Sequence, residues 1–101
     1  MLTAGLFGLA QPAHAAAGDS VECYNGNYSG YKIECIADVT GSQITWTFNG
    51  SHLAAYDGKT IMFANCGTYG SPYHVTVNYI DSTTGAPAEV DTYNTCGTPN
   101  P

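Results

Sequence analysis

The chain has 101 residues, with 2 basic residues against 8 acidic ones, and its formal net charge at pH 7 is -6. So acidic a chain is a poor ligand for nucleic acid or for an anionic membrane, and we expect neither as a partner. Its polar residues are mainly Thr, Ser, Asn, Gly and Tyr, which together with many β-forming residues is typical of a small secreted β domain.

The first residues predict a secretory signal peptide. Residues 2–10 form an apolar segment that is too short to span a bilayer. Ala13-His14-Ala15 follows with the small-x-small pattern of a cleavage site, so we expect residues 1–15 to be removed by a cut after Ala15 or Ala17. No basic residue precedes the apolar segment, as in a truncated signal peptide, and the alternative is a disordered apolar tail. The remaining chain divides into a domain over residues 18–97 and a polar tail over 98–101.

Two strands are predicted at residues 20–24 and 31–39, joined by a segment rich in turn residues. Successive side chains of a strand point to opposite faces, so alternate residues share a face. The inward set in the second strand is Tyr31, Ile33, Cys35, Ala37 and Val39, and the outward set is Lys32, Glu34 and Asp38. Ile36 is the one apolar residue expected outside. We expect the two strands to form a hairpin.

The middle of the chain predicts three further strands. Residues 40–42 read as a break, and the strand at 43–49 places Ile44, Trp46 and Phe48 on one face. Trp46 is the only Trp and is expected at the centre of the core because of its large area. Asp57-Gly58 predicts a type I′ hairpin between residues 53–56 and 59–63. In the second of these segments Ile61 and Phe63 alternate with Thr60 and Met62.

The clearest strand is predicted at residues 73–80, where Tyr73, Val75, Val77 and Tyr79 share the inner face and His74 lies outside. A turn at residues 81–85 returns the chain to a partner strand at 89–96. No stretch shows a helical period over ten or more residues. The fold class is therefore all-β, an antiparallel β-sandwich of about seven strands.

Four cysteines, at positions 23, 35, 66 and 96, predict two disulfides, because an even count in a short exported chain is typical of disulfide-bonded domains. Their wide spacing and the lack of a CxxC pair argue against a zinc site. Cys23 and Cys35 share a face of the first hairpin, so they are expected to pair. Cys66 ends a strand that we expect beside the last one, so it is expected to pair with Cys96.

A family resemblance rests on two segments. Residues 44–50, Ile-Thr-Trp-Thr-Phe-Asn-Gly, resemble the Trp-containing strand and turn of bacterial PKD-like and immunoglobulin-like domains. Residues 73–77, followed by Asp81 and Gly85, resemble their Tyr-x-Val-x-Val strand and turn. The flanking cysteines and the Ala-rich start are similar to small secreted proteins of Streptomyces-like actinobacteria. The resemblance implies an immunoglobulin-like sandwich that serves binding, adhesion or spacing.

No catalytic residue, metal site or cofactor is predicted. Ser51-His52 and Ser71 with His74 are the only candidate nucleophile and base pairs, and neighbours on a strand point to opposite faces. Asp81, Ser82 and Thr84, with Glu89 or Asp91, could form a weak calcium site. The favoured reading is a hairpin turn in which Asp81 accepts hydrogen bonds.

The compositional feature that bears most on function is the number of tyrosines in or beside loops. Amphipathic rings among Asn, Ser and Gly are typical of contact surfaces. The predicted ligand-binding residues are Tyr24, Tyr28, Tyr56 and Tyr69. The leading hypothesis is a monomeric, secreted, non-catalytic module that binds a polysaccharide or protein. One alternative is an inhibitor of a secreted hydrolase, which should present a rigid, disulfide-tied loop such as 67–72. The other is a carrier of a small molecule, which should show a deep apolar cleft.

Overall fold

The computed structural model describes residue 15 and residues 17–25 and 32–97. The predicted signal peptide up to residue 14, Tyr28, Tyr31 and the tail over 98–101 lie outside the described residues. Among the described residues, no helix is long and apolar enough to cross a membrane.

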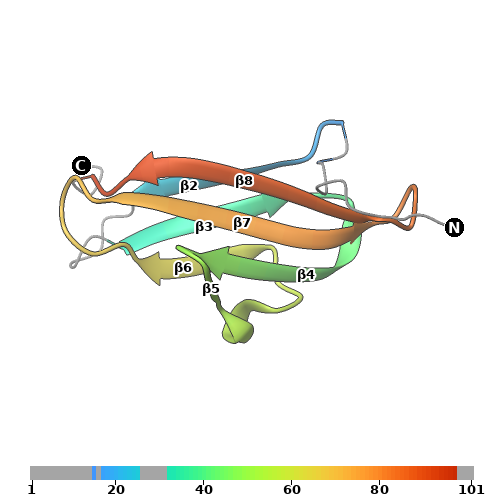
Figure 1. Cartoon of the computed structure of the whole chain (residues 1–101), viewed down its shortest axis with the longest axis horizontal. Helices are drawn as coiled ribbons and strands as arrows, with labels where there is room; N and C mark the ends of the chain where they lie inside the picture. Colours follow the sequence, from blue (N-terminus) through green and yellow to red (C-terminus); the bar gives the residue numbers. More distant parts are fainter. Residues whose placement is uncertain (1–14, 16, 26–31, 98–101) are drawn as a thin grey trace, which may run out of the picture.

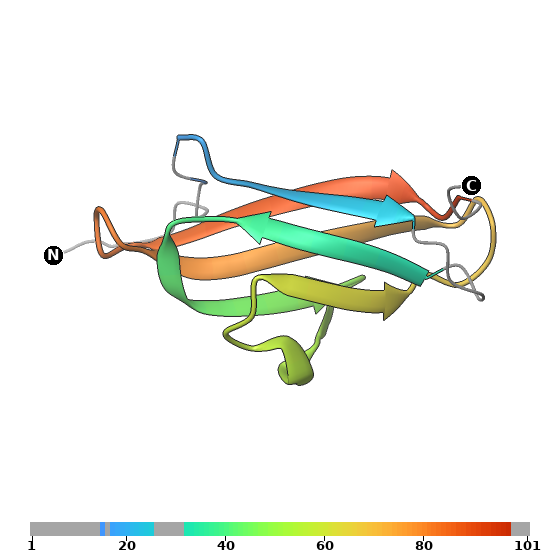
Figure 2. The ribbon, with the colours of Figure 1, turned by 180° about the vertical axis from the view of Figure 1, so that it is seen from behind.

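The described chain contains seven strands in two antiparallel sheets (Figures 1 and 2). The strands are β2 (Ser20–Asn25), β3 (Lys32–Asp38), β4 (Gly41–Phe48), β5 (Ser51–His52), β6 (Ile61–Asn65), β7 (Pro72–Asp81) and β8 (Pro87–Thr95). A three-stranded sheet has the order β2-β3-β6, and a four-stranded sheet has the order β5-β4-β7-β8. The prediction of an all-β, seven-stranded antiparallel fold is confirmed.

The core lies between the two sheets and follows the predicted period of two. Trp46 is fully buried, and its indole Nε1 donates a hydrogen bond of 2.8 Å to the carbonyl oxygen of Lys59. The inner face predicted for β7 is confirmed, since its four members are all buried. Ile36 lies outside, as expected. The fully or almost fully buried side chains are Trp46, Ile33, Met62, Val75, Val77, Cys35 and Cys96.

The segment between β4 and β6 differs from the predicted hairpin. Residues 54–56 form a single 3-10 turn, η1 (Ala54–Tyr56), and β6 pairs with β3 in the other sheet. Asp57-Gly58 forms a turn of type II rather than I′, with φ -56 and ψ 131 at Asp57, φ 79 at Gly58, and a 3.0 Å bond from Lys59 N to Tyr56 O. The prediction failed because bonds to β4 hold this segment as it crosses between sheets, including a 2.7 Å bond from Gly58 N to Ile44 O.

The predicted break at residues 40–42 is also wrong, because β4 begins at Gly41. A Cβ atom on Gly41 would lie 2.3 Å from the carbonyl oxygen of Ile80, so the glycine marks a close approach of two strands. The register with β7 shifts between Ser42 and Thr45, where Gln43 has a φ of 54. This irregularity is a β-bulge, which lets the strand continue through a segment that reads as a turn.

Both disulfide pairings are confirmed. Cys23 and Cys35 are directly opposite in the β2–β3 hairpin, with a Cα–Cα distance of 4.0 Å. The expected reason for the Cys66–Cys96 pair is wrong, because β6 and β8 belong to different sheets. This second disulfide, with a Cα–Cα distance of 5.9 Å, joins the two sheets at one end of the sandwich. Two disulfides suit a protein of an oxidising, extracellular environment.

Alkaline pH is expected to destabilise the fold through Tyr73. This side chain is only 3% exposed, and burial raises its pKa above the ordinary value of 10.0. A folded-state pKa above the unfolded one gives stability that is complete below pH 10.0 and is lost as the pH rises through the folded-state pKa. Denaturant midpoints measured from about pH 8 to pH 11 should fall for wild type and fall less for Tyr73→Phe. Tyr69→Phe, at an exposed position, is the control. If the denaturant midpoint falls equally with rising pH in wild type and in Tyr73→Phe, Tyr73 is not the cause of the alkaline destabilisation.

Candidate functional site

The outer face of the four-stranded sheet presents polar side chains in rows across neighbouring strands. Thr47 of β4 lies opposite Thr76 of β7, and Thr76 lies opposite Asp91 of β8. His52 of β5 continues the row, since it pairs with Thr47. These positions point outward because each alternates with an inward residue such as Trp46 or Val75. These side chains form a surface of hydrogen-bonding groups.

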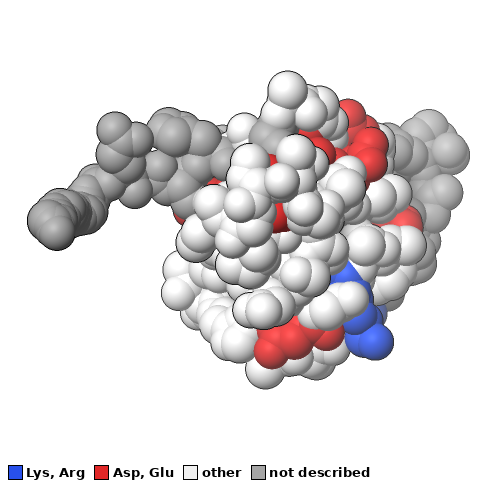
Figure 3. Space-filling view, turned by 90° about the vertical axis from the view of Figure 1, so that its right-hand side faces the viewer, with Lys and Arg blue, Asp and Glu red and all other residues white. Residues whose placement is uncertain are grey.

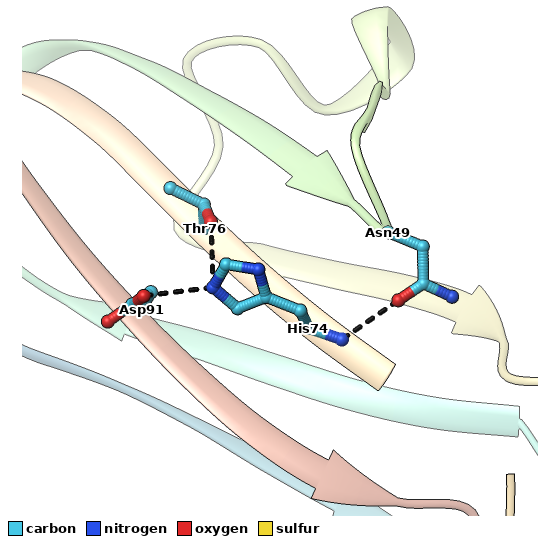
Figure 4. Close-up of polar contacts among 4 residues, drawn as sticks. All are labelled: Asn49, His74, Thr76 and Asp91. Atoms are coloured by element: carbon cyan, nitrogen blue, oxygen red, sulfur yellow. Dashed lines mark hydrogen bonds and ion pairs between the residues drawn. The ribbon is translucent and has the colours of Figure 1, made fainter. Parts of the chain in front are cut away.

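His74 is the centre of a polar cluster on this face (Figure 4). Its Nε2 lies 2.8 Å from Asp91 Oδ2 and 3.3 Å from Thr76 Oγ1. Its ring stacks on the ring of Tyr93 with a centroid separation of 3.9 Å and an interplanar angle of 2°. Tyr93 is nevertheless 73% exposed. The imidazole is therefore fixed on one side by an aromatic ring and at its edge by a carboxylate.

Local backbone structure explains why these groups meet. His74 and Tyr93 are register partners in the β7–β8 ladder, so their side chains stand side by side on the same face. Asn49 follows β4 with a φ of 50, a left-handed conformation that Asn tolerates well. Its side-chain Oδ1 accepts a 2.8 Å bond from the backbone N–H of His74, and its own N–H donates to His74 O at 2.8 Å. Asn49 thus extends the ladder beyond the end of β4.

The cluster does not have the geometry of a catalytic triad. In a triad the carboxylate and the nucleophile contact different nitrogens of the histidine. Here Asp91 and Thr76 both approach Nε2, and an ionised carboxylate can only accept, so Nε2 carries the proton and cannot act as a base toward Thr76. The arrangement is suited to orienting rings and hydrogen-bonding groups.

A shallow hollow lies beside the ring pair at the end of the sheet. Its volume is about 260 Å³, and it is lined by Asn49, Pro72, Tyr73, His74 and Tyr93. A larger hollow of about 380 Å³ lies between the start of β2 and β8 and is lined by three acidic residues, Asp19, Glu89 and Asp91, without an aromatic ring. We take the smaller hollow as the candidate site because it combines aromatic surface with positioned polar groups.

The loop that leads into β7 lies at the same end of the sheet as the smaller hollow. Cys66 anchors it through the disulfide to Cys96, and Gly70 N donates a 2.6 Å bond to Cys96 O. Ser71 accepts a 2.8 Å bond from Cys96 N through its carbonyl oxygen, and its side chain lies 2.7 Å from that of Thr68. Tyr69 in this loop is 65% exposed. The loop is therefore held by the disulfide and by these hydrogen bonds, and it presents the exposed ring of Tyr69.

The predicted loop tyrosines come from separate elements. Tyr24 lies on the outer face of the other sheet, where its hydroxyl donates to the Glu22 carboxylate and this hydrogen bond raises the pKa of Tyr24. Tyr56 belongs to η1 and packs against the core, while Tyr69 is exposed in the loop that leads into β7. Tyr28 lies outside the described residues. The ligand-binding role of all four stays a prediction.

Sequence reasoning missed Tyr93, and it considered His74 as an outward polar residue and as a candidate base with Ser71, but not as part of a binding site. The missing information was the register of the last hairpin. Ile80 pairs with Pro87, which fixes His74 opposite Tyr93, whereas the partner strand was expected to start only at residue 89. A different register between β7 and β8 would place another side chain opposite His74.

The turn at residues 81–85 uses Asp81 as an internal acceptor. This carboxylate, only 6% exposed, accepts bonds from Thr83 N at 3.2 Å and from Thr84 Oγ1 at 3.0 Å. The oxygens that a calcium ion would need are thus engaged in the turn, as the favoured reading expected. Within the described ranges no group of three or more His, Cys, Asp or Glu residues could hold a metal ion. Figure 3 shows carboxylate groups in separate places on the end of the molecule that it presents.

Comparison with known proteins gave no match to a family model, to a curated protein or to a solved structure. The resemblance to immunoglobulin-like and PKD-like domains therefore stays a prediction, and the site has to be interpreted from its own geometry.

Proposed function

We propose that the chain is a secreted, non-catalytic binding module whose ligand is a polysaccharide. The contact surface is the end of the four-stranded sheet around His74 and Tyr93. The observation that carries the proposal is the ring of Tyr93, which is 73% exposed although one of its faces is stacked on a hydrogen-bonded histidine.

The chemistry of a sugar ring matches this surface. A pyranose has an apolar face of C–H groups and an equatorial rim of hydroxyls. The flat ring of Tyr93 can stack against the C–H face, and the Asp91 carboxylate and the Asn49 amide can bond hydroxyls at the rim. Because His74 and Tyr93 already hold each other, binding costs little side-chain entropy.

Secretion is part of the same proposal. It rests on the signal-peptide pattern at residues 1–15 and on the two disulfides, which persist in an oxidising environment. The low content of charged side chains, 10% of residues, also suits a ligand that is neutral. The immunoglobulin-like resemblance supports a scaffold of this kind, whose function depends on its surface.

Retention on insoluble polysaccharides tests the proposal. Purified protein should be retained on at least one of cellulose, chitin, xylan or cell-wall peptidoglycan, and Tyr93→Ala should lower the affinity at least about tenfold because it removes the stacking ring. Tyr93 is exposed, so the variant should unfold at nearly the wild-type midpoint. Phe63→Ala removes an exposed ring from the three-stranded sheet and serves as a control that should leave retention unchanged.

Failure of the wild-type protein to bind any of these polymers would count directly against a glycan ligand. Equal retention of wild type and Tyr93→Ala would instead place the contact elsewhere on the molecule.

The tied loop around Tyr69 favours one second candidate, an inhibitor of a secreted hydrolase. A disulfide and two backbone bonds to Cys96 hold this loop, and Tyr69 is 65% exposed at its tip. Such a rigid loop can fill the substrate cleft of an enzyme at low entropic cost. Inhibition of a secreted protease that is lost in Tyr69→Ala but kept in Tyr93→Ala would favour this candidate. The carrier alternative lacks support, since described inner faces are filled by side chains such as Trp46 and Met62.

A further inference from the structure

The outward side chains of β8 extend the candidate site away from the ring of Tyr93. Asp91 and Glu89 precede Tyr93 at every second position, and the residues between Glu89 and Asp91 and before Glu89, Val90 and Ala88, are buried. Tyr93, Asp91 and Glu89 therefore form one row on the outer face of the four-stranded sheet. Successive members of such a row are about 7 Å apart, so a sugar stacked on Tyr93 has a carboxylate next to its rim.

The neighbouring row on β7 is uncharged apart from its histidine. The register places His74 opposite Tyr93, Thr76 opposite Asp91, and Asn78 opposite Glu89. A hydroxyl and an amide thus stand beside the two carboxylates and supply hydrogen bonds without charge.

The four-stranded sheet contributes no lysine or arginine to offset these carboxylates. The chain has two basic residues, Lys32 and Lys59. Lys32 belongs to β3 in the other sheet, and Lys59 lies in the segment between η1 and β6. The surface around Asp91 is therefore negative and can be neutralised by a cation that the ligand brings.

Asp91 connects the two hollows of this region. It lines the larger one, beside Glu89 and Asp19, and it contacts His74, which lines the smaller one. The contact to His74 Nε2 uses only Oδ2 of Asp91, and the Asp91 side chain is 41% exposed. Since a neutral imidazole donates this hydrogen bond without adding charge, the carboxylate stays negative and accessible to a ligand.

The chemistry of a carboxylate distinguishes between classes of sugar. An ionised carboxylate only accepts hydrogen bonds, and the bonds that it accepts from charged donors are stronger than those from neutral ones. A neutral sugar can bind here through stacking and its hydroxyls. A protonated amino group adds a charge-assisted hydrogen bond, whereas an acidic sugar brings a like charge next to Asp91 and Glu89.

We propose that Asp91 determines the specificity of the site, and that the preferred ligand is a polysaccharide of amino sugars with free, protonated amino groups. The amine bonds Asp91 while a sugar ring stacks on Tyr93, and Glu89 extends the same preference along the row. This inference rests on the proposed polysaccharide function and adds to it the chemical class of the ligand.

The test compares three soluble tetrasaccharides, of glucosamine, of glucose with the same linkage, and of galacturonic acid. The isotope-labelled full chain is titrated with each at about pH 7, where ordinary amines are mainly protonated and ordinary imidazoles mainly neutral. Wild type should bind the glucosamine oligomer at least about threefold more tightly than the glucose oligomer, and the acidic oligomer most weakly. The largest shifts should lie at His74, Asp91 and Tyr93.

Asp91→Asn removes the charge but keeps the size of the side chain and an oxygen that can accept from His74. It should bring the ratio of the glucosamine and glucose affinities close to one. The control is Glu34→Gln, on the outer face of the three-stranded sheet, which carries Tyr24, Glu34 and Phe63 and is termed the β2–β3–β6 face. This variant also removes one negative charge and should keep the wild-type ratio. Thermal unfolding of both variants establishes that their fold is retained.

The outcomes separate the specificity from the proposed function. Equal wild-type affinities for the glucosamine and glucose oligomers, with shifts at His74 and Tyr93, would overturn the specificity and leave polysaccharide binding standing. Binding of none of the oligosaccharides or insoluble polymers would overturn both. A preference for glucosamine that is unchanged in Asp91→Asn, or that falls equally in Glu34→Gln, would assign it to the net charge of -6 and overturn the role of Asp91.

Discussion

Reduction of the two disulfides is expected to unfold the domain at moderate temperature. The bonds close loops with sequence separations of 12 and 30 residues. By the chain-entropy relation these closures stabilise the folded state by about 3 and about 4 kcal/mol. Their sum is comparable to the net stability of a small domain, about 5 to 15 kcal/mol. A thermal scan in reducing buffer should therefore show a midpoint lower by at least about 20 °C, or no cooperative transition.

Paired substitutions separate the two bonds. Replacement of both Cys66 and Cys96 should lower the free energy of unfolding more than replacement of both Cys23 and Cys35. The Cys66–Cys96 disulfide closes the longer loop and joins the two sheets. The Cys35 side chain is fully buried. The loss of stability in the variant with Cys23→Ala and Cys35→Ala therefore also includes the effect of a smaller side chain in the core. A reduced wild-type protein that melts within about 5 °C of the oxidised one would show that the core alone holds the fold.

Replacement of Trp46 is the second change with a large expected effect. The side chain is fully buried at the centre of the core, and its indole N–H satisfies the carbonyl oxygen of Lys59. Trp46→Ala should lower the free energy of unfolding by about 3 to 5 kcal/mol, because it leaves a large cavity and an unpaired acceptor. Denaturant unfolding followed by circular dichroism measures the loss, since the variant has no Trp for fluorescence.

Trp46→Phe is the matched variant, because it keeps an aromatic ring but has no N–H donor. Trp46→Phe should lower the free energy of unfolding less than Trp46→Ala does. A loss of under about 1 kcal/mol in Trp46→Ala would mean that the core is not organised around this residue.

The sequence predicts the fold well where side-chain alternation is strong. β7 and β3 have a clear period of two, and the buried positions of both follow it. Prediction failed where tertiary bonds override local preference. Leu53 and Tyr56 read as strand residues, but the crossing between sheets holds their segment by bonds such as Leu53 N to Trp46 O at 2.9 Å. Likewise, Gly41 reads as a break although a neighbouring strand requires its lack of a side chain.

The candidate site was less predictable because it depends on the register between strands. His74 and Tyr93 are separated in sequence and meet only through the β7–β8 pairing. The loop tyrosines were selected by composition, which says nothing about the face that a ring occupies. Tyr24 consequently lies on the β2–β3–β6 face, whereas Tyr69 lies at the end of the sheet that carries His74.

Mapping of a bound sugar tests the central claim most directly. The labelled protein is titrated with soluble oligosaccharides cut from the polymer that retains it, and backbone and side-chain shifts are followed. The account predicts the largest shifts at Asn49, His74, Asp91 and Tyr93, with loss of those shifts in Tyr93→Ala. Shifts centred on the β2–β3–β6 face or on η1, with His74 and Tyr93 unaffected, would contradict it.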